Sequence, residues 1–269
     1  MANSYVHGYD SRESVRLQDQ ASTLEELLHS DTSYPRSSLV LEAGCGVGAQ
    51  TLPLAQKSPQ AEIVAVEISR PSALLAKENI EQAGLLNVRI IQGDIFRLPF
   101  REASFDHLFL CFVLEHLPRP LEALLALKQF IRPGGSITVI EGDHGSAYFH
   151  PDSAAARRAI GCQVKLQRMA GGNANIGREL YPLLRAAGFS DVSVSPRMVY
   201  VDSSRPELVE GFTKRTFTAM IEGVGEAAIG AGLIEPAEFE AGVLDLYRTA
   251  EEDGVFCYTF FKARGRWDG

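Results

Sequence analysis

Residues 39–51 read LVLEAGCGVGAQT, an apolar run that ends in Glu42 and continues into three glycines at alternate positions. This order predicts a strand, a tight turn and the start of a helix, the unit through which parallel α/β sheets bind nucleotide cofactors. Glycine accepts a positive φ and has no Cβ, so a ligand can approach the backbone of such a turn closely. The segment therefore predicts a cofactor loop at Gly44 and Gly46.

The spacing of the glycines separates two classes of cofactor. A dinucleotide sets its pyrophosphate on the helix N-terminus and is typically bound by G-x-G-x-x-G, but here the third glycine, Gly48, comes one residue early. S-adenosylmethionine has no phosphate and carries a cationic sulfonium, so its loop needs close backbone approach and a nearby carboxylate. Glu42 supplies that carboxylate, and the loop favours S-adenosylmethionine over NAD.

Four further apolar segments repeat the strand pattern along the chain. The first, at 63–66, ends in Glu67, where a carboxylate can accept hydrogen bonds from both ribose hydroxyls. The next, at 88–92, ends in Asp94, a short carboxylate that an adenine amino group could reach. The predicted cofactor-binding residues are Glu42, Gly44, Cys45, Gly46, Glu67, Ile68, Gly93, Asp94, Ile95 and Phe112, with Tyr9 and Arg16 ahead of the core.

Taken together, these motifs resemble those of the class I S-adenosylmethionine-dependent methyltransferases, in the broad group that includes the ubiquinone and menaquinone biosynthesis methyltransferases. The matching pieces are EAGCGVG at 42–48, VE at 66–67, GD at 93–94, SFD at 104–106, LEH at 114–116 and RPGG at 132–135. The resemblance implies an α/β fold with a doubly wound, mostly parallel seven-stranded sheet, S-adenosylmethionine as cofactor and methyl transfer as activity. It covers roughly residues 36–142, so it says less about the substrate.

The segments outside these motifs predict a cover and a lid. A helix over 11–29 is expected to cover the cofactor, so we divide the chain into a helical cover at 1–35 and a methyltransferase domain at 36–269. Two helices, at about 205–230 and 236–253, form an insertion at about 203–253 between the last two strands. Four side chains of the cover could bind the carboxylate of the cofactor's methionine portion: Tyr5, Tyr9, Arg16 and Gln20. They could equally form an ordinary solvated helix face.

The segment 142–146, GDHGS, is predicted to be a polar loop at the carboxyl end of the fifth strand, 136–141. Open α/β sheets bind their ligands at this edge. Methyl transfer is an in-line displacement that needs no covalent enzyme residue, and a base is needed only if the acceptor keeps its proton. The candidates for this base are His144, His116 and Asp143, with His150 a weaker fourth; His116 could instead cap the next helix, and His144 could be an ordinary buried polar residue.

Two kinds of metal site are disfavoured. Glu141, Asp143, His144 and His150 lack the spacing of a metal site, and no metal is expected. The four cysteines have no metal-binding spacing either, and disulfides are not expected in a reducing compartment.

The composition of the chain disfavours two classes of binding partner, nucleic acids and membranes. A formal charge of −8 argues against a general nucleic-acid binder, which needs a basic surface. No apolar run is long enough to span a membrane and no secretory signal opens the chain, so a cytoplasmic location is expected. We expect a small-molecule methyl acceptor and leave open whether the chain is a monomer or a homodimer.

Three alternatives remain. One is a sensor or partner subunit that binds S-adenosylmethionine or S-adenosylhomocysteine without transferring a methyl group. Another is a methyltransferase of tRNA or protein, which a basic face around the pocket would support. The third is an NAD-dependent enzyme, which the early third glycine and Gly93-Asp94 disfavour.

Overall fold

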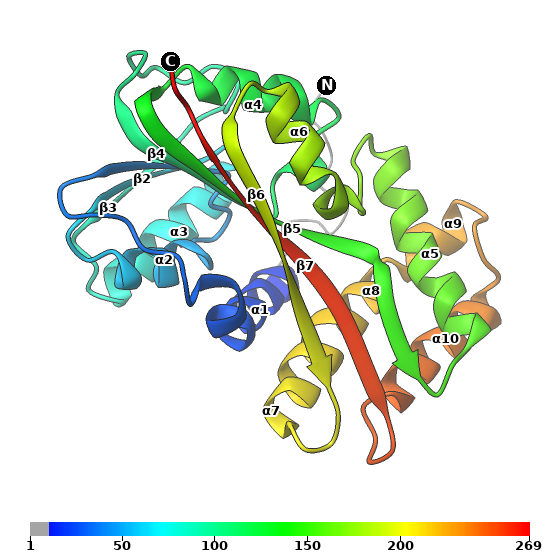
Figure 1. The fold of residues 1–269 in the computed structure, drawn as a ribbon. Coiled ribbons are helices and arrows are strands. Elements are labelled where there is room, and N and C mark those ends of the chain that lie inside the picture. Colours follow the sequence, from blue (N-terminus) through cyan, green and yellow to red (C-terminus); the bar gives the residue numbers. More distant parts are fainter. Residues whose placement is uncertain (1–10) are drawn as a thin grey trace.

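The protein, in a computed structural model that describes residues 11–269 without the side chains of 11–15 and 17–19, is built on one seven-stranded sheet (Figure 1). The strands are β1 (Leu39–Ala43), β2 (Glu62–Glu67), β3 (Val88–Gln92), β4 (Phe105–Cys111), β5 (Ile131–His150), β6 (Ser190–Val201) and β7 (Val255–Arg266). Their order across the sheet is β3-β2-β1-β4-β5-β7-β6. Only β7 runs antiparallel to its neighbours, which confirms the predicted doubly wound, mostly parallel sheet.

Helices connect the strands and lie on both faces of the sheet (Figure 1). Before β5 come α1 (Ser11–His29), α2 (Thr51–Lys57), α3 (Arg70–Gln82), the 3₁₀ turn η1 (Leu114–His116) and α4 (Pro120–Lys128). Between β5 and β6 come α5 (Ala154–Met169), η2 (Ile176–Glu179) and α6 (Leu180–Ala186). Between β6 and β7 come α7 (Pro206–Leu208), η3 (Val209–Thr218), α8 (Ala219–Gly223), α9 (Gly225–Gly230) and α10 (Pro236–Arg248).

Alternation along the strands builds a separate core on each face of the sheet. Val40 and Phe109 pack with the apolar side chains of α1 and α2, whereas the adjacent Leu41 and Leu108 pack with those of α4 and α6. Successive side chains of a strand point to opposite faces, so a run that is apolar throughout must be covered on both sides. The central strands therefore have the continuous apolar sequence of a buried parallel sheet.

The expectation of a polar loop at 142–146 is wrong, because β5 continues to His150. Its pairing with β7 runs through Asp143 opposite Thr259, is interrupted, and resumes at Tyr148. In the interruption the Ser146 hydroxyl donates to the Asp143 carbonyl at 2.6 Å and accepts from the Thr259 amide at 3.0 Å. One serine thus satisfies backbone groups that the irregular ladder leaves unpaired, so the polar sequence remains within a strand.

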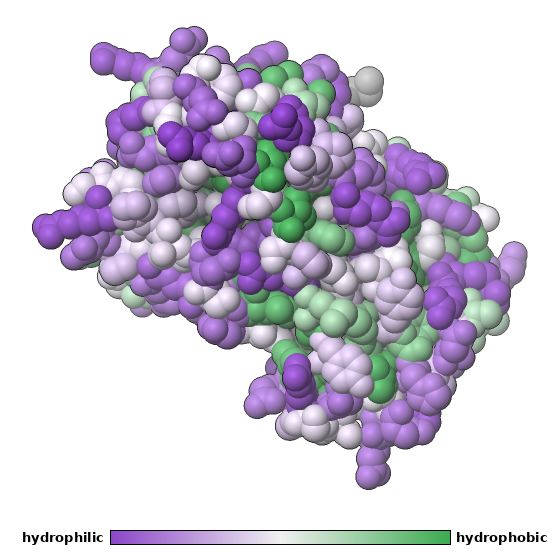
Figure 2. Space-filling model, in the orientation of Figure 1, coloured by the Kyte–Doolittle hydropathy of each residue, from purple (hydrophilic) through white to green (hydrophobic). Residues whose placement is uncertain are grey.

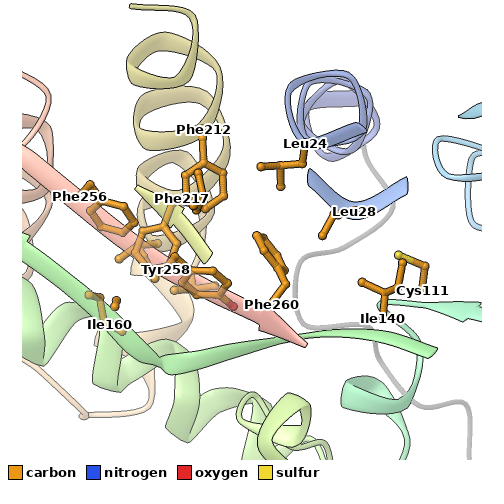
Figure 3. Close-up of a cluster of buried hydrophobic side chains, with 14 of the residues drawn as sticks. Leu24, Leu28, Cys111, Ile140, Ile160, Phe212, Phe217, Phe256, Tyr258 and Phe260 are labelled. Carbon is orange, nitrogen blue, oxygen red and sulfur yellow. The ribbon is translucent and has the colours of Figure 1, made fainter. Parts of the chain in front are cut away.

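The helix expected at about 205–230 is divided into four pieces. Its longest piece, η3, is a π-helix, in which the Thr216 hydroxyl donates to the Gly211 carbonyl five residues back at 2.7 Å. Gly211 lies against Thr23 of α1, and a Cβ at Gly211 would collide with that side chain. The wider turn also sends Phe212 and Phe217 into the apolar cluster that α1 and β7 share (Figure 3).

The surface in the orientation of Figure 1 is mostly hydrophilic, with hydrophobic side chains gathered in a band across its middle (Figure 2). Within the described residues, no helix has both the length and the apolar character that crossing a membrane requires.

Candidate functional site

The glycine loop between β1 and α2 is fixed to the neighbouring strand and leaves space above one of its glycines. The amides of Gly44 and Cys45 both donate to the Val66 carbonyl, at 2.8 and 3.0 Å. A Cβ at Gly44 would come within 2.7 Å of Val113, whereas one at Gly46 would meet no described atom within 4 Å. Both glycines have positive φ. The loop is therefore closely packed against Val113 at Gly44, whereas the space beside Gly46 is open.

Glu67, the last residue of β2, connects this loop to the next turn. Its Oε2 accepts from the Gly46 amide at 3.0 Å and its Oε1 accepts from the Ser69 amide at 2.8 Å. Burial raises the pKa of Glu67, and the amide hydrogen bonds oppose that shift. Each carboxylate oxygen has two lone pairs, so both oxygens can still accept a hydrogen bond from a ligand. The next residue, Ile68, is 61% exposed.

Asp94 follows β3 at the same edge of the sheet. Its Oδ1 accepts from the Phe96 amide at 2.9 Å, and its side chain is half-buried. The Gly93 amide donates to the Glu67 carbonyl at 2.9 Å, which brings the ends of β2 and β3 together. Ile95 packs at the border of the core.

Phe112 follows β4. Its φ is +58°, and its ring centroid lies 5.6 Å from that of Phe260. The positive φ is uncommon for an aromatic residue and marks a sharp turn at the carboxyl end of this strand.

Glu42, on β1, is a buried carboxyl with an unsatisfied oxygen. Only 2% of the residue is exposed, and burial raises its pKa to about 7, against the opposing effect of the Thr51 hydroxyl. Among the described residues, Oε2 of Glu42 has no hydrogen-bond partner. An ionised carboxylate is costly in such a place unless a cation accompanies it.

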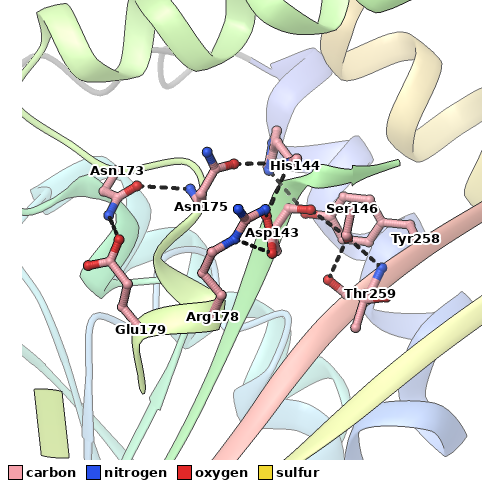
Figure 4. A network of polar contacts seen from close by, with 10 residues as sticks. Asp143, His144, Ser146, Asn173, Asn175, Arg178, Glu179, Tyr258 and Thr259 are labelled. Carbon is pink, nitrogen blue, oxygen red and sulfur yellow. Dashed lines mark hydrogen bonds and ion pairs between the residues drawn. The ribbon is translucent and has the colours of Figure 1, made fainter. Parts of the chain in front are cut away.

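His144, on β5, is held at one ring nitrogen by Tyr258 (Figure 4). Nδ1 lies 3.0 Å from the Tyr258 hydroxyl, and the His144 amide donates to the Ala174 carbonyl at 3.0 Å. Nε2 has no partner among the described residues, although the side chain is only 7% exposed. Burial lowers the pKa of His144, the Glu115 carboxylate opposes that shift, and the ring lies 6.3 Å from that of Phe217. His144 is therefore a neutral imidazole at pH 7.

Asp143, the second base candidate, is engaged by an arginine instead. Nε and Nη2 of Arg178 donate to its two oxygens at 2.7 and 2.6 Å, and the Gly145 amide donates to Oδ1 at 3.1 Å (Figure 4). These three hydrogen bonds occupy three of the four lone pairs of the Asp143 carboxyl group, and the bidentate arginine fixes its position. His150 lies at the far end of β5, exposed and opposite Val255, so β5 does not bring it to His144.

His116, in η1, lies beside a buried polar group. Its Nε2 is 3.4 Å from Oε1 of Glu115, and Gln167 of α5 donates to the Glu115 carbonyl at 3.0 Å. Gln163 donates to Gln167 at 3.1 Å. Sequence reasoning missed these two glutamines, although their spacing of four residues on a helix whose same face is otherwise apolar was a usable signal.

Glu141 supports the turn that carries these residues. Its Oε1 accepts from the amides of Val113 and Leu114 at 3.0 and 2.7 Å. Burial, followed by the charge of Glu115, raises its pKa well above the usual range. The two amide hydrogen bonds to this carboxyl fix the start of η1, and burial favours its protonated form.

The N-terminal candidates are described only in part. Tyr5 and Tyr9 lie outside the described residues. Arg16 donates from Nη1 to Gln20 at 3.3 Å, and its charge contributes to the lowered pKa of His144, so α1 carries it to the same end of the sheet. Within the described part of the chain, no group of three His, Cys, Asp or Glu residues is arranged to hold a metal ion.

Comparisons with known proteins match part of the chain to methyltransferases. Residues 41–139 match the family model described as "Methyltransferase domain". The demethylmenaquinone methyltransferase of Staphylococcus aureus is 27% identical over 134 residues, which are 49% of this chain and 55% of that protein. The chain matches the first curated relatives over only 54–62% of their own length.

Solved structures share the fold at low identity. The Haemonchus contortus phosphoethanolamine N-methyltransferase 2 in complex with S-adenosyl-L-methionine has a TM-score of 0.56 at 12% identity, over 93% of this chain and 53% of that one. The [4+2]-cyclase SpnF has the same TM-score at 20% identity, over 93% of this chain and 81% of that one. At these identities the likeness shows the fold alone, which hosts more than one chemistry.

Residues 41–139 carry the methyltransferase domain, and together with the relatives and the seven-stranded sheet they support a class I S-adenosylmethionine-dependent methyltransferase with a Rossmann-like fold. Two features of the site fit S-adenosylmethionine. Among the described residues, one oxygen of the buried Glu42 carboxyl has no hydrogen-bond partner, and the space over Gly46 holds no protein atom.

Proposed function

We propose that the chain transfers a methyl group from S-adenosylmethionine to a small-molecule acceptor. The observation that carries the proposal is the convergence of three carboxyl groups, those of Glu42, Glu67 and Asp94, on the carboxyl ends of three adjacent strands around an open glycine loop. A nucleoside with two ribose hydroxyls, an amino group on its base and a cationic chain offers a partner to each of them.

Each residue has separate work in this proposal. Glu67 accepts hydrogen bonds from the ribose hydroxyls on the lone pairs that Gly46 and Ser69 leave free. Asp94 accepts from the adenine amino group, and Glu42 balances the positive charge of the methionine portion. Bound S-adenosylmethionine supplies an electrophilic methyl group.

On the acceptor side, His144 orients the substrate. Burial raises the pKa of the Tyr258 phenol well above its usual range, so Tyr258 keeps its proton. We assign this proton to the hydrogen bond with Nδ1 of His144, which places the proton of the neutral imidazole on Nε2. His144 thus donates a hydrogen bond to the acceptor molecule, and positions it rather than deprotonating it.

The first experiment is calorimetric titration with S-adenosylmethionine and, separately, S-adenosylhomocysteine. We expect micromolar binding that is lost in Glu67→Gln and Asp94→Asn. Glu81→Gln, an exposed carboxylate of α3 paired with Lys77, is the matched control and should bind as the unchanged chain does. Absence of binding to both nucleosides would overturn the proposal, and binding of NAD instead would establish a dinucleotide enzyme.

An assay of methyl transfer distinguishes an enzyme from a sensor that only binds the cofactor. We expect methyl transfer to one member of a panel of quinols, phenols and amines, and loss of that transfer in His144→Phe with cofactor affinity unchanged. Binding without transfer to any acceptor would favour the sensor or partner subunit, and transfer to tRNA or protein fractions would contradict the small-molecule acceptor. The net charge of −8 supports the small molecule.

A further inference from the structure

The opposite edge of the sheet carries a second hollow. It has a volume of about 350 Å³ and lies where the linker after α1 passes the amino ends of β4 and β5. The cofactor loop lies at the carboxyl ends of the strands, so this hollow is separate from the site described above. Its lining consists of Asp31, Thr32, Ser33, Tyr34, Pro35, His107, Ser136, Ile137, Thr138 and Arg264.

Positive charge is in excess at one wall of this hollow. Asp31 pairs with Lys262 at 2.6 Å, with Arg197 at 2.6 Å and with Arg264 at 3.0 Å. Hydrogen bonds from Lys262 and Arg197 outweigh the effect of burial and hold the pKa of Asp31 well below its usual range. One ionised carboxylate thus faces three cations, of which Arg264 lines the hollow while Lys262 and Arg197 contact Asp31 without lining it. The nearby Asp106 does not cancel the excess, because it is paired with Arg132 at 2.6 Å.

Donors remain available within the hollow. Arg264 bonds through Nη2 to the carbonyl and the carboxylate of Asp31, which among the described residues leaves its Nε and Nη1 without a protein partner. Thr32 accepts from Lys262 through its hydroxyl oxygen and so keeps its proton to donate. Ser33 is exposed beside it. A guanidinium edge flanked by hydroxyl groups is the usual donor set for a phosphate group.

We propose that this hollow is a second binding site, for a ligand that carries a phosphate group. Two positive charges in excess match a phosphate dianion. The volume exceeds what a free phosphate fills, and the rings of Tyr34 and His107, stacked at 4.7 Å, offer an apolar wall to the organic part of a phosphate monoester. In this proposal the ligand binds beside the linker at residues 31–35, which connects α1 to β1. This inference does not rest on the proposed methyl transfer.

The test is thermal unfolding of the full chain with inorganic phosphate and with phenyl phosphate, each against sodium chloride at equal ionic strength. We expect a saturable rise in Tm, and a tighter response to phenyl phosphate if the organic group occupies the hollow. In Arg264→Gln the apparent affinity should fall about tenfold or more, because a charge-assisted hydrogen bond is lost.

Arg266→Gln is the matched control. Arg266 lies two residues further along β7, is exposed, pairs with Asp268 and does not line the hollow, so its variant should respond as the unchanged chain does. No saturable effect beyond that of sodium chloride would overturn the proposal. An equal response in Arg264→Gln would overturn it too, because general salting-out by phosphate would then explain the rise.

Discussion

Gly46→Ala is expected to weaken cofactor binding far more than it weakens the fold. The residue has φ +55°, where an alanine costs about 1–2 kcal/mol of folding free energy. Its new Cβ would meet no described atom within 4 Å, so no packing penalty is added to that strain. The methyl group would stand in the space over the loop, and carbon atoms approach one another only to about 3.5–4.0 Å. A cofactor in contact with this backbone must therefore retreat, and we expect its affinity to fall at least about tenfold, or about 1.4 kcal/mol.

Gly84→Ala is the matched control for this prediction. Gly84 follows α3, has φ +67° and would likewise place a Cβ in open space, but it is remote from the loop. Denaturant unfolding should give similar losses of stability for the two variants, and calorimetry with S-adenosylhomocysteine should show a loss of affinity only for Gly46→Ala. Equal affinities in both variants would refute the placement of the cofactor over Gly46.

Three further predictions concern buried charges. Glu42 has a folded pKa of about 7 against an unfolded value near 4.5, so the free energy of unfolding of the ligand-free protein should fall by up to about 3 kcal/mol as pH rises from 4.5 to 7. Glu42→Gln should abolish this loss, measured by urea unfolding at pH 5 and pH 8. A cationic ligand favours ionised Glu42, so cofactor binding at pH 6 should release up to one proton, measured by calorimetry in buffers of different ionisation enthalpy; no release would contradict the pairing. Lys262→Met removes hydrogen bonds to Leu28, Asp31 and Thr32 and should lower the unfolding free energy by about 1–3 kcal/mol, whereas an unchanged midpoint in urea would show that this buried cation contributes nothing.

The strands, and the carboxylates that stand at their ends, could be predicted from the sequence because both depend on the local pattern of apolar residues. Apolar runs of five to seven residues must be buried, and the chain must turn where they stop. Glu67 ends β2 and Asp94 follows β3, at the positions that the motifs indicate. The fold follows from this alternation of strands and helices, since parallel strands need crossover connections.

The surroundings of His144 could not be predicted in the same way. Tyr258, which bonds to His144, is 114 residues away along the chain, and Arg178, which engages Asp143, comes from η2. Neither pairing has a local signal, because each depends on how far β5 continues beside β7. The missed length of β5 and the missed role of Tyr258 are therefore one error: the chain beyond Glu141 was interpreted from its own polarity rather than from the strand that pairs with it.

The unsatisfied groups of the site favour a ligand-bound state. Glu42 and Glu141 are both buried, and burial raises the pKa of each, so neither can ionise cheaply in the ligand-free fold. Two amides donate to Oε1 of Glu141, but among the described residues Oε2 of Glu141, Oε2 of Glu42 and Nε2 of His144 have no hydrogen-bond partner. A buried polar atom without a partner costs about 1–3 kcal/mol. In the proposed function, the cofactor would satisfy Glu42 and the acceptor would satisfy His144, so binding would recover this cost: the same unpaired atoms that lower the stability of the empty protein would then raise its affinity for these ligands.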